Sequence, residues 1–67
     1  MRRARCECGH TVAGEDSTEA AQLMHDHIME AHPDCKLPAL DKLQIAIGKA
    51  HRYGASAMPT IILYREG

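Results

Sequence analysis

Two short clusters of cysteine and histidine are the feature that most constrains how this 67-residue chain can fold. Cys6 and Cys8 form the first cluster, and His27 and His32 form the second, about twenty residues later. Two thiolates and two imidazoles make a complete tetrahedral ligand set for Zn²⁺, and the spacing of the histidines lies within the range that structural zinc sites use. The sequence therefore predicts one Zn²⁺ per chain, bound by these four residues.

The composition gives a second reason to expect a metal. The chain has no Phe and no Trp, so its core must be built from Leu, Ile, Met and Val, with two Tyr as the only other large apolar side chains. A domain of this size with such a core is marginally stable by itself. Coupled zinc binding can contribute on the order of 10 kcal/mol to folding. We therefore expect one domain that depends on its metal.

The segment around the cysteines is expected to be a tight β-hairpin. Residues 6–14 are few and contain two glycines, Gly9 and Gly14, which is typical of two paired extended segments joined by a turn. Alternate residues of a straight strand lie about 6.5 Å apart, whereas two sulfurs on one zinc ion lie less than about 4 Å apart. The chain must therefore bend at the cysteines, and Gly9 can permit that bend.

A helix is predicted over residues 18–31, with His27 in the middle of its apolar face. About 100° of rotation per residue separates successive side chains, so His25 points to the opposite side, toward water. The N-cap candidates are Asp16, Ser17 and Thr18. The apolar residues on the face of His27 are Ala20, Leu23, Met24 and Ala31.

The second histidine of the pair is expected to lie just outside this helix. Residues five apart in an ideal helix diverge by about 140° and cannot share an ion. Pro33 disfavours helical geometry at His32, so the chain leaves the helix there and His32 can turn back toward His27. His25 and His32 share a face, but they lie about 10 Å apart along the helix axis, too far for one tetrahedral ion.

Two alternatives to the ligand Cys6 remain open from the sequence. A Cys-x-Cys pair is a less specific signal than Cys-x2-Cys, and His10 could join Cys8 in its place. Cys35 lies three residues after His32 and could also replace Cys6. The simpler interpretation of Cys35 is a free thiol.

The sequence of the second half of the chain predicts a helix followed by a strand. Residues 34–38 are expected to be a linker, and a helix runs from Pro38 or Ala39 to Arg52, with Gly54 as its C-terminal stop. One apolar face of this helix holds Ala39, Leu40, Leu43, Ala46, Ile47 and Ala50. Residues 59–64 are expected to be a strand that pairs with the cysteine hairpin, pairs with another copy, or remains a partly ordered tail.

The expected fold class is α+β: a small zinc-stabilised β-hairpin plus helix, a second amphipathic helix and a possible C-terminal strand. Residues 1–5 are expected to be a mobile basic arm, residues 6–33 a zinc-binding ββα-like unit, and residues 34–67 a helical extension with the strand. All three parts belong to one domain, because the chain is too short for two cores.

The metal-binding half resembles a known family. The segment from Cys8 to Asp16, followed by His27-x4-His32-Pro33, resembles a family of short prokaryotic proteins described as predicted small metal-binding proteins of unknown function. The resemblance covers about the first half of the chain and implies that Cys6 and Cys8 match the family's cysteines and His27 and His32 its histidines. The order of ligands is also similar to that of a ββα Cys2His2 zinc finger with a shortened knuckle.

The favoured function is a structural zinc protein that acts as a protein-interaction module. A closed set of four ligands leaves no open coordination position, so the chain is not expected to be an enzyme and no small-molecule substrate is implied. Apolar residues outside the predicted core faces, namely Ile28, Met29 and Ile45, indicate a protein partner or a homodimer.

The alternative is a nucleic-acid-binding zinc finger. It would use Arg2, Arg3 and Arg5 for phosphates and the exposed helix face for bases. The formal net charge is −1, and the helix face is acidic enough to repel phosphate, so this alternative ranks second. The residues of that face are Glu19, Gln22, His25, Asp26 and Glu30.

Cellular location follows from the cysteines and the hydropathy. Three cysteines are an odd number, which suits a disulfide scaffold poorly. No apolar run approaches the length of a membrane span, and the first residues lack the apolar segment of a signal peptide. The sequence therefore predicts a reduced, cytoplasmic protein without a membrane partner.

Overall fold

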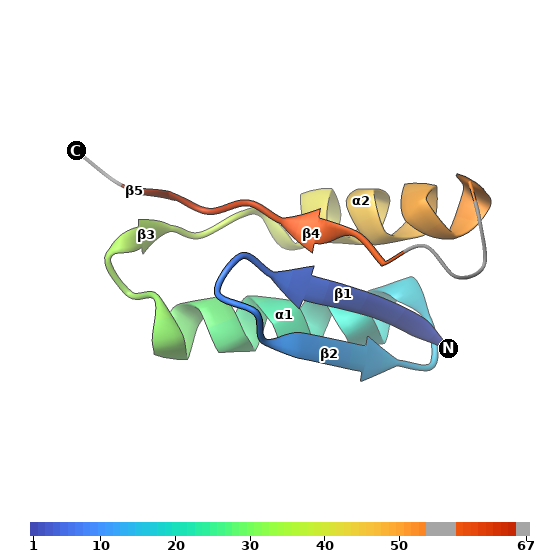
Figure 1. The fold of residues 1–67 in the computed structure, drawn as a ribbon, viewed down its shortest axis with the longest axis horizontal. Coiled ribbons are helices and arrows are strands. Elements are labelled where there is room, and N and C mark those ends of the chain that lie inside the picture. The colour runs from blue at the N-terminus through green and yellow to red at the C-terminus, as the bar shows by residue number, and fades with distance from the viewer. Residues whose placement is uncertain (54–57, 66–67) are drawn as a thin grey trace.

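A three-stranded sheet packs one face against two helices, and a second, two-stranded sheet extends the molecule at one end (Figure 1). The computed structural model describes residues 1–53 and 58–65. This architecture confirms the predicted α+β class. Its elements are β1 (Arg2–Cys6), β2 (Thr11–Gly14), α1 (Ser17–Ala31), β3 (Cys35–Lys36), α2 (Leu40–Tyr53), β4 (Thr60–Ile61) and β5 (Tyr64–Arg65).

Strand β1 lies in the middle of the larger sheet. It pairs antiparallel with β2, where Arg2 lies opposite Gly14, and parallel with β4, where Cys6 lies opposite Ile61. The expectation of a mobile basic arm at residues 1–5 is therefore wrong. Burial alternates along β1, because Ala4 and Cys6 are buried while Arg3 and Arg5 are exposed. The inward residues are small, so this alternation gives a weak hydrophobic signal in the sequence.

The C-terminal segment reaches both sheets. Of the three alternatives for residues 59–64, the structure shows pairing with the cysteine-bearing strand through β4. The chain then passes Ile62 and Leu63 and forms β5, which pairs antiparallel with β3. Residues 34–38 are consequently more than a linker, since β3 provides this second pairing.

Both helices lie close to their predicted positions. Asp16 caps α1, and its Oδ1 accepts a hydrogen bond from the backbone N–H of Glu19 at 2.8 Å. Helix α1 ends at Ala31, as predicted. Helix α2 begins at Leu40, so Pro38 precedes the helix instead of occupying its first turn. Gly54, the predicted stop, lies outside the described residues.

The buried face of α1 differs from the predicted one. Ile28 is fully buried although it was expected to be exposed, and Leu23 is 41% exposed although it was expected in the core. Helix α1 contacts both the sheet and α2, so its buried arc is rotated away from His27, which lies at the edge of that arc. His25 is half-buried instead of pointing to water.

The core combines one face of the larger sheet with the facing sides of both helices. Met29 and Ile45 are exposed, as predicted. Within the part of the chain that is described, no helix is long and apolar enough to cross a membrane. The buried apolar residues are Ala4, Cys6, Val12, Ala20, Ala21, Met24, Ile28, Leu43, Ile47, Ile61 and Leu63.

The close packing of β2 on the start of α1 predicts a strong effect of Gly14→Ala. A Cβ at this position would lie 2.5 Å from the backbone nitrogen of Ala20, so the helix or strand must shift. We expect the free energy of unfolding to fall by about 1–3 kcal/mol. The matched control is Gly48→Ala on α2, where a Cβ meets no atom within 4 Å and helix propensity favours Ala. Urea unfolding at constant zinc concentration measures both, and equal stability of Gly14→Ala and wild type would contradict the described packing.

Candidate metal centre

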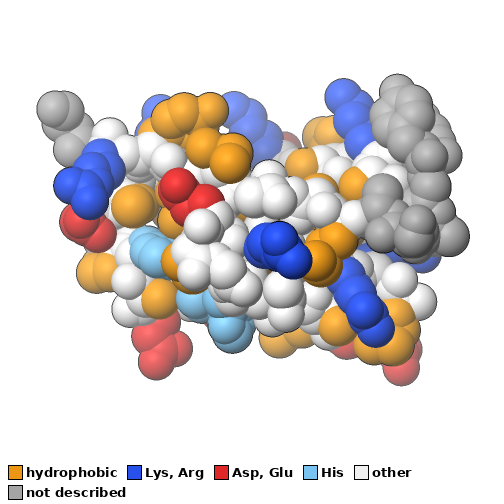
Figure 2. Space-filling model, viewed as in Figure 1, with side chains coloured by type: hydrophobic (Ala, Val, Ile, Leu, Met, Phe, Trp, Pro, Cys, Tyr) orange, Lys and Arg blue, Asp and Glu red, His pale blue; other side chains and the backbone are white. Residues whose placement is uncertain are grey.

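Four side chains converge where the β1–β2 turn meets the end of α1. Cys6 is the last residue of β1, Cys8 lies in the turn, His27 lies in the last turns of α1, and His32 directly follows the helix. One ligand atom from each of the four lies within 4.8 Å of all the others. On the face seen in Figure 2, histidine side chains gather in this region.

The turn between β1 and β2 produces the predicted bend. The N–H of Cys6 donates to the carbonyl of His10 at 2.7 Å, and the N–H of Gly9 donates to the carbonyl of Cys6 at 2.9 Å. Gly9 has a φ of +99°, the one positive φ among the described residues. A three-residue loop that ends in a left-handed glycine is a common hairpin connection, and it brings the side chain of Cys8 back beside that of Cys6.

The end of α1 brings the two histidines together. His32 is the C-cap, with φ −130° and ψ 59°, and its N–H still donates to the carbonyl of Ile28 at 2.9 Å. Its ring lies nearly perpendicular to that of His27, with centroids 5.2 Å apart. The prediction that His32 leaves the helix and turns toward His27 is therefore confirmed.

Two distances between sulfur and nitrogen fit a tetrahedral ion. Cys6 Sγ lies 3.6 Å from His32 Nε2, and Cys8 Sγ lies 3.5 Å from His27 Nε2. A tetrahedron with Zn–S bonds near 2.3 Å and Zn–N bonds near 2.0–2.1 Å has S···N edges of about 3.5–3.6 Å. Both contacts therefore have the length of edges of a Zn²⁺ coordination shell.

The two thiols differ in their electrostatic surroundings. The backbone N–H of His10, and then the imidazoles of His27 and His32, lower the pKa of Cys8 to about 6. Burial raises the pKa of Cys6 above its ordinary value. The exposed thiol of Cys8 therefore ionises more readily than an ordinary cysteine, whereas the buried thiol of Cys6 favours its neutral form. A bound cation would stabilise both as thiolates.

The residues that could have replaced Cys6 lie outside this group of ligand atoms. The ring of His10 stacks on that of His27, with centroids 4.1 Å apart and an interplanar angle of 12°. Cys35 is half-buried and packs against the hydrophobic core. Among the described residues, the cluster that could hold a metal consists of Cys6, Cys8, His27 and His32.

Two of the three basic residues of the alternative site, Arg3 and Arg5, lie away from the helix face that was expected to accompany them. Arg3 and Arg5 are exposed on β1, on the side of the sheet opposite to Ala4 and Cys6, which face the helices. The acidic face of α1 therefore lies on the other layer of the molecule. Arg2, the third of the predicted basic residues, is half-buried and lies on the same side of β1 as Ala4 and Cys6. The structure therefore separates Arg3 and Arg5 from the acidic helix face.

Sequence reasoning missed the role of Glu7, which lies between the two cysteines. Its N–H donates to the carbonyl of Ile61 at 3.1 Å, and its Oε1 accepts the N–H of Leu63 at 2.8 Å. These two hydrogen bonds of Glu7 connect the C-terminal segment to the turn that carries Cys8. A glutamate in a turn gives no signal of such a contact, because its partner lies 56 residues away.

The order β1–β2–α1, with two cysteines at the hairpin turn and two histidines at the helix end, is ββα-like and forms a small Cys2His2-like site. Comparisons with known proteins add no relative: no family model matches the chain, and neither a curated protein nor a solved structure matches it. The assignment of this centre therefore rests on its geometry.

The left-handed turn predicts that Gly9→Ala weakens metal binding. A Cβ at Gly9 would meet no atom within 4 Å, so the penalty comes from the backbone conformation alone and amounts to about 1–2 kcal/mol. We expect zinc affinity, measured by competition with a chelating dye, to fall by about tenfold. Gly9→Asn is the matched control, since Asn tolerates left-handed geometry better than Ala, and its loss should be smaller. Equal affinities of the Ala variant and wild type would contradict the described turn.

Proposed function

We propose that this chain is a structural zinc protein whose folded surface serves as a protein-interaction module. One observation carries the proposal: two sulfurs and two imidazole nitrogens lie within 4.8 Å of one another, with S···N distances of 3.5 and 3.6 Å. Two soft thiolates with two imidazoles suit Zn²⁺ better than they suit Mg²⁺ or Ca²⁺, which prefer oxygen.

The donor set supports a structural role for the metal. Four protein ligands fill a tetrahedral shell, so neither water nor a substrate would find an open position on the ion. Cys6 is fully buried, which places one ligand inside the core. We therefore infer that the chain is not an enzyme, and that zinc joins the hairpin to the end of α1.

Because the hydrophobic core is small, the link that zinc would form between the hairpin and α1 is important for stability. The buried residues of the core include Ala4, Ala20 and Ala21, which bury little apolar area compared with larger side chains. Metal binding would add the free energy that these residues do not supply. Thiolate ligands also suit a reducing compartment such as the cytoplasm.

Nucleic-acid binding is the second candidate, favoured by Arg3 and Arg5 on the exposed face of β1. The neighbouring exposed residues on β2 are Thr11 and Ala13. Among the described residues of β1 and β2, this sheet face thus offers two cations and no aromatic ring for base stacking. Exposed apolar residues, including Met29 and Ile45, are better explained by a protein partner.

Removal of the metal is the first test. We expect native mass spectrometry of the purified chain to show one zinc ion, and chelation to reduce the helical signal in circular dichroism and lower the melting temperature. The reason is that the four-ligand cluster links the hairpin to α1 and supplements a small core. A chain that is metal-free as purified, takes up no added zinc and keeps its melting temperature would refute the proposal.

Substitution of one ligand gives a second test. His27→Ala should abolish zinc binding and unfold the domain at ordinary temperature, because three ligands remain and the folding energy of the metal is lost. His25→Ala, two residues earlier on the same helix, is the control: its ring lies outside the cluster, so zinc binding should be retained. Circular dichroism and zinc content would report both, and equal losses would contradict the ligand assignment.

A further inference from the structure

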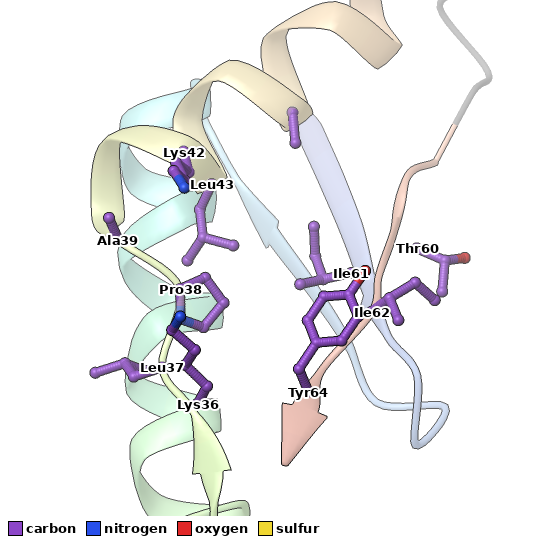
Figure 3. A pocket seen from close by; sticks show the side chains of 11 residues that line it. Lys36, Leu37, Pro38, Ala39, Lys42, Leu43, Thr60, Ile61, Ile62 and Tyr64 are labelled. Carbon is purple, nitrogen blue, oxygen red and sulfur yellow. The ribbon is translucent and has the colours of Figure 1, made fainter. Parts of the chain in front are cut away.

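A hollow in the described surface lies between α2 and the C-terminal segment, and none of the four candidate metal ligands lines it. It has a volume of about 620 Å³ and an apolar floor. Leu43 of α2 and Ile61 of β4 point into it from opposite sides, and Pro38 and the ring of Tyr64 line it further along (Figure 3). We call this hollow, bounded by residues 36–46 and 60–64, the α2–β4 groove.

One wall of the α2–β4 groove is the free edge of a sheet. Strand β4 is the last strand in the order β2-β1-β4, and its partner among the described residues is β1 alone. Pro59 and Ile61 direct their carbonyls toward β1, where they accept from Arg5 and Glu7. Because backbone groups alternate along a strand, those of Thr60 and Ile62 point away from β1, toward the open edge.

The edge is short, since β4 has two residues and follows Pro59, but apolar side chains are exposed beside it. Ile62 is 54% exposed and Tyr64 is 69% exposed, so the segment that follows β4 presents apolar surface next to the unpaired edge. Figure 2 shows hydrophobic side chains on the surface along the β4–β5 segment, with Lys or Arg side chains beside them. An unpaired strand edge next to an apolar hollow is the arrangement that binds an extended peptide by strand addition.

The charged side chains that line the α2–β4 groove indicate which kind of partner it could bind. The charged side chains that line the groove are Lys36 and Lys42. Both are exposed, and neither forms an ion pair within residues 1–53 and 58–65. A second copy of this chain placed edge to edge would bring these lysines toward their own counterparts, which is unfavourable. An acidic peptide would instead meet a complementary potential.

We propose that the α2–β4 groove binds an extended acidic peptide segment, which adds as a strand to β4 and places apolar side chains between Leu43 and Ile61. The proposal rests on the proposed function, for which it supplies the site and the class of partner. Main-chain hydrogen bonds to β4 would give affinity, and the apolar floor with two lysines would give specificity. Glu7 connects this wall of the groove to the metal turn.

The test is a selection from random peptides displayed on phage, using the zinc-loaded full chain. Zinc content and circular dichroism of the same sample show first whether the metal centre and the fold are intact. We expect enriched peptides to be acidic and to carry apolar residues at alternate positions. Their dissociation constants should rise about tenfold in Lys36→Glu/Lys42→Glu, because two attractions become repulsions. Lys49→Glu, an equal charge change on α2 outside the groove lining, should leave them unchanged.

A backbone probe separates strand addition from simple charge attraction. In one enriched peptide, N-methylation of alternate amides should abolish binding in one register and preserve it in the other, because only one set of N–H groups faces β4. Failure to enrich peptides, equal binding to the double variant, or indifference to methylation would each overturn the groove proposal. A folded, zinc-loaded chain with any of these results would leave the metal assignment intact, whereas a zinc-free chain would overturn the proposed function itself.

Discussion

The convergence of two sulfurs and two imidazole nitrogens at the end of α1 is the interaction on which the rest of the molecule depends. It joins the turn of the β1–β2 hairpin to the end of α1. Cys6 belongs to both the ligand cluster and the hydrophobic core, because it is a candidate ligand and is fully buried. The position of β1 in the sheet and the geometry of the cluster are therefore fixed together.

The parts that could be predicted from the sequence are those governed by local rules. Asp16 capped the helix as its residue type suggested, and Pro33 ended it, so that His32 left the helical path. Gly9 adopted the conformation that only glycine adopts readily. Because these local features determine where the four ligands lie, the candidate site could be assembled from sequence more reliably than the surrounding fold.

The parts that were missed depend on distant partners. Residues 2–5 form the central strand because β2 and β4 flank them, and β4 comes from the other end of the chain. Ile28 is buried because α1 faces both a sheet and a second helix, which a single amphipathic period does not reveal. The contact of Glu7 with Leu63 has the same origin. Tertiary packing decided each of these features.

The parallel pairing of β1 with β4 has a consequence for the order of folding. Glu7 and Leu63 are 56 residues apart in the chain, so closing this contact costs considerably more entropy than forming the adjoining hairpin and helix. We expect the β1–β2–α1 unit to assemble first, through contacts that are short in sequence. The C-terminal strand then docks onto a template that already exists. The same argument makes this strand the first to detach, and its departure would expose Ile61 and Leu63, which are buried in the core.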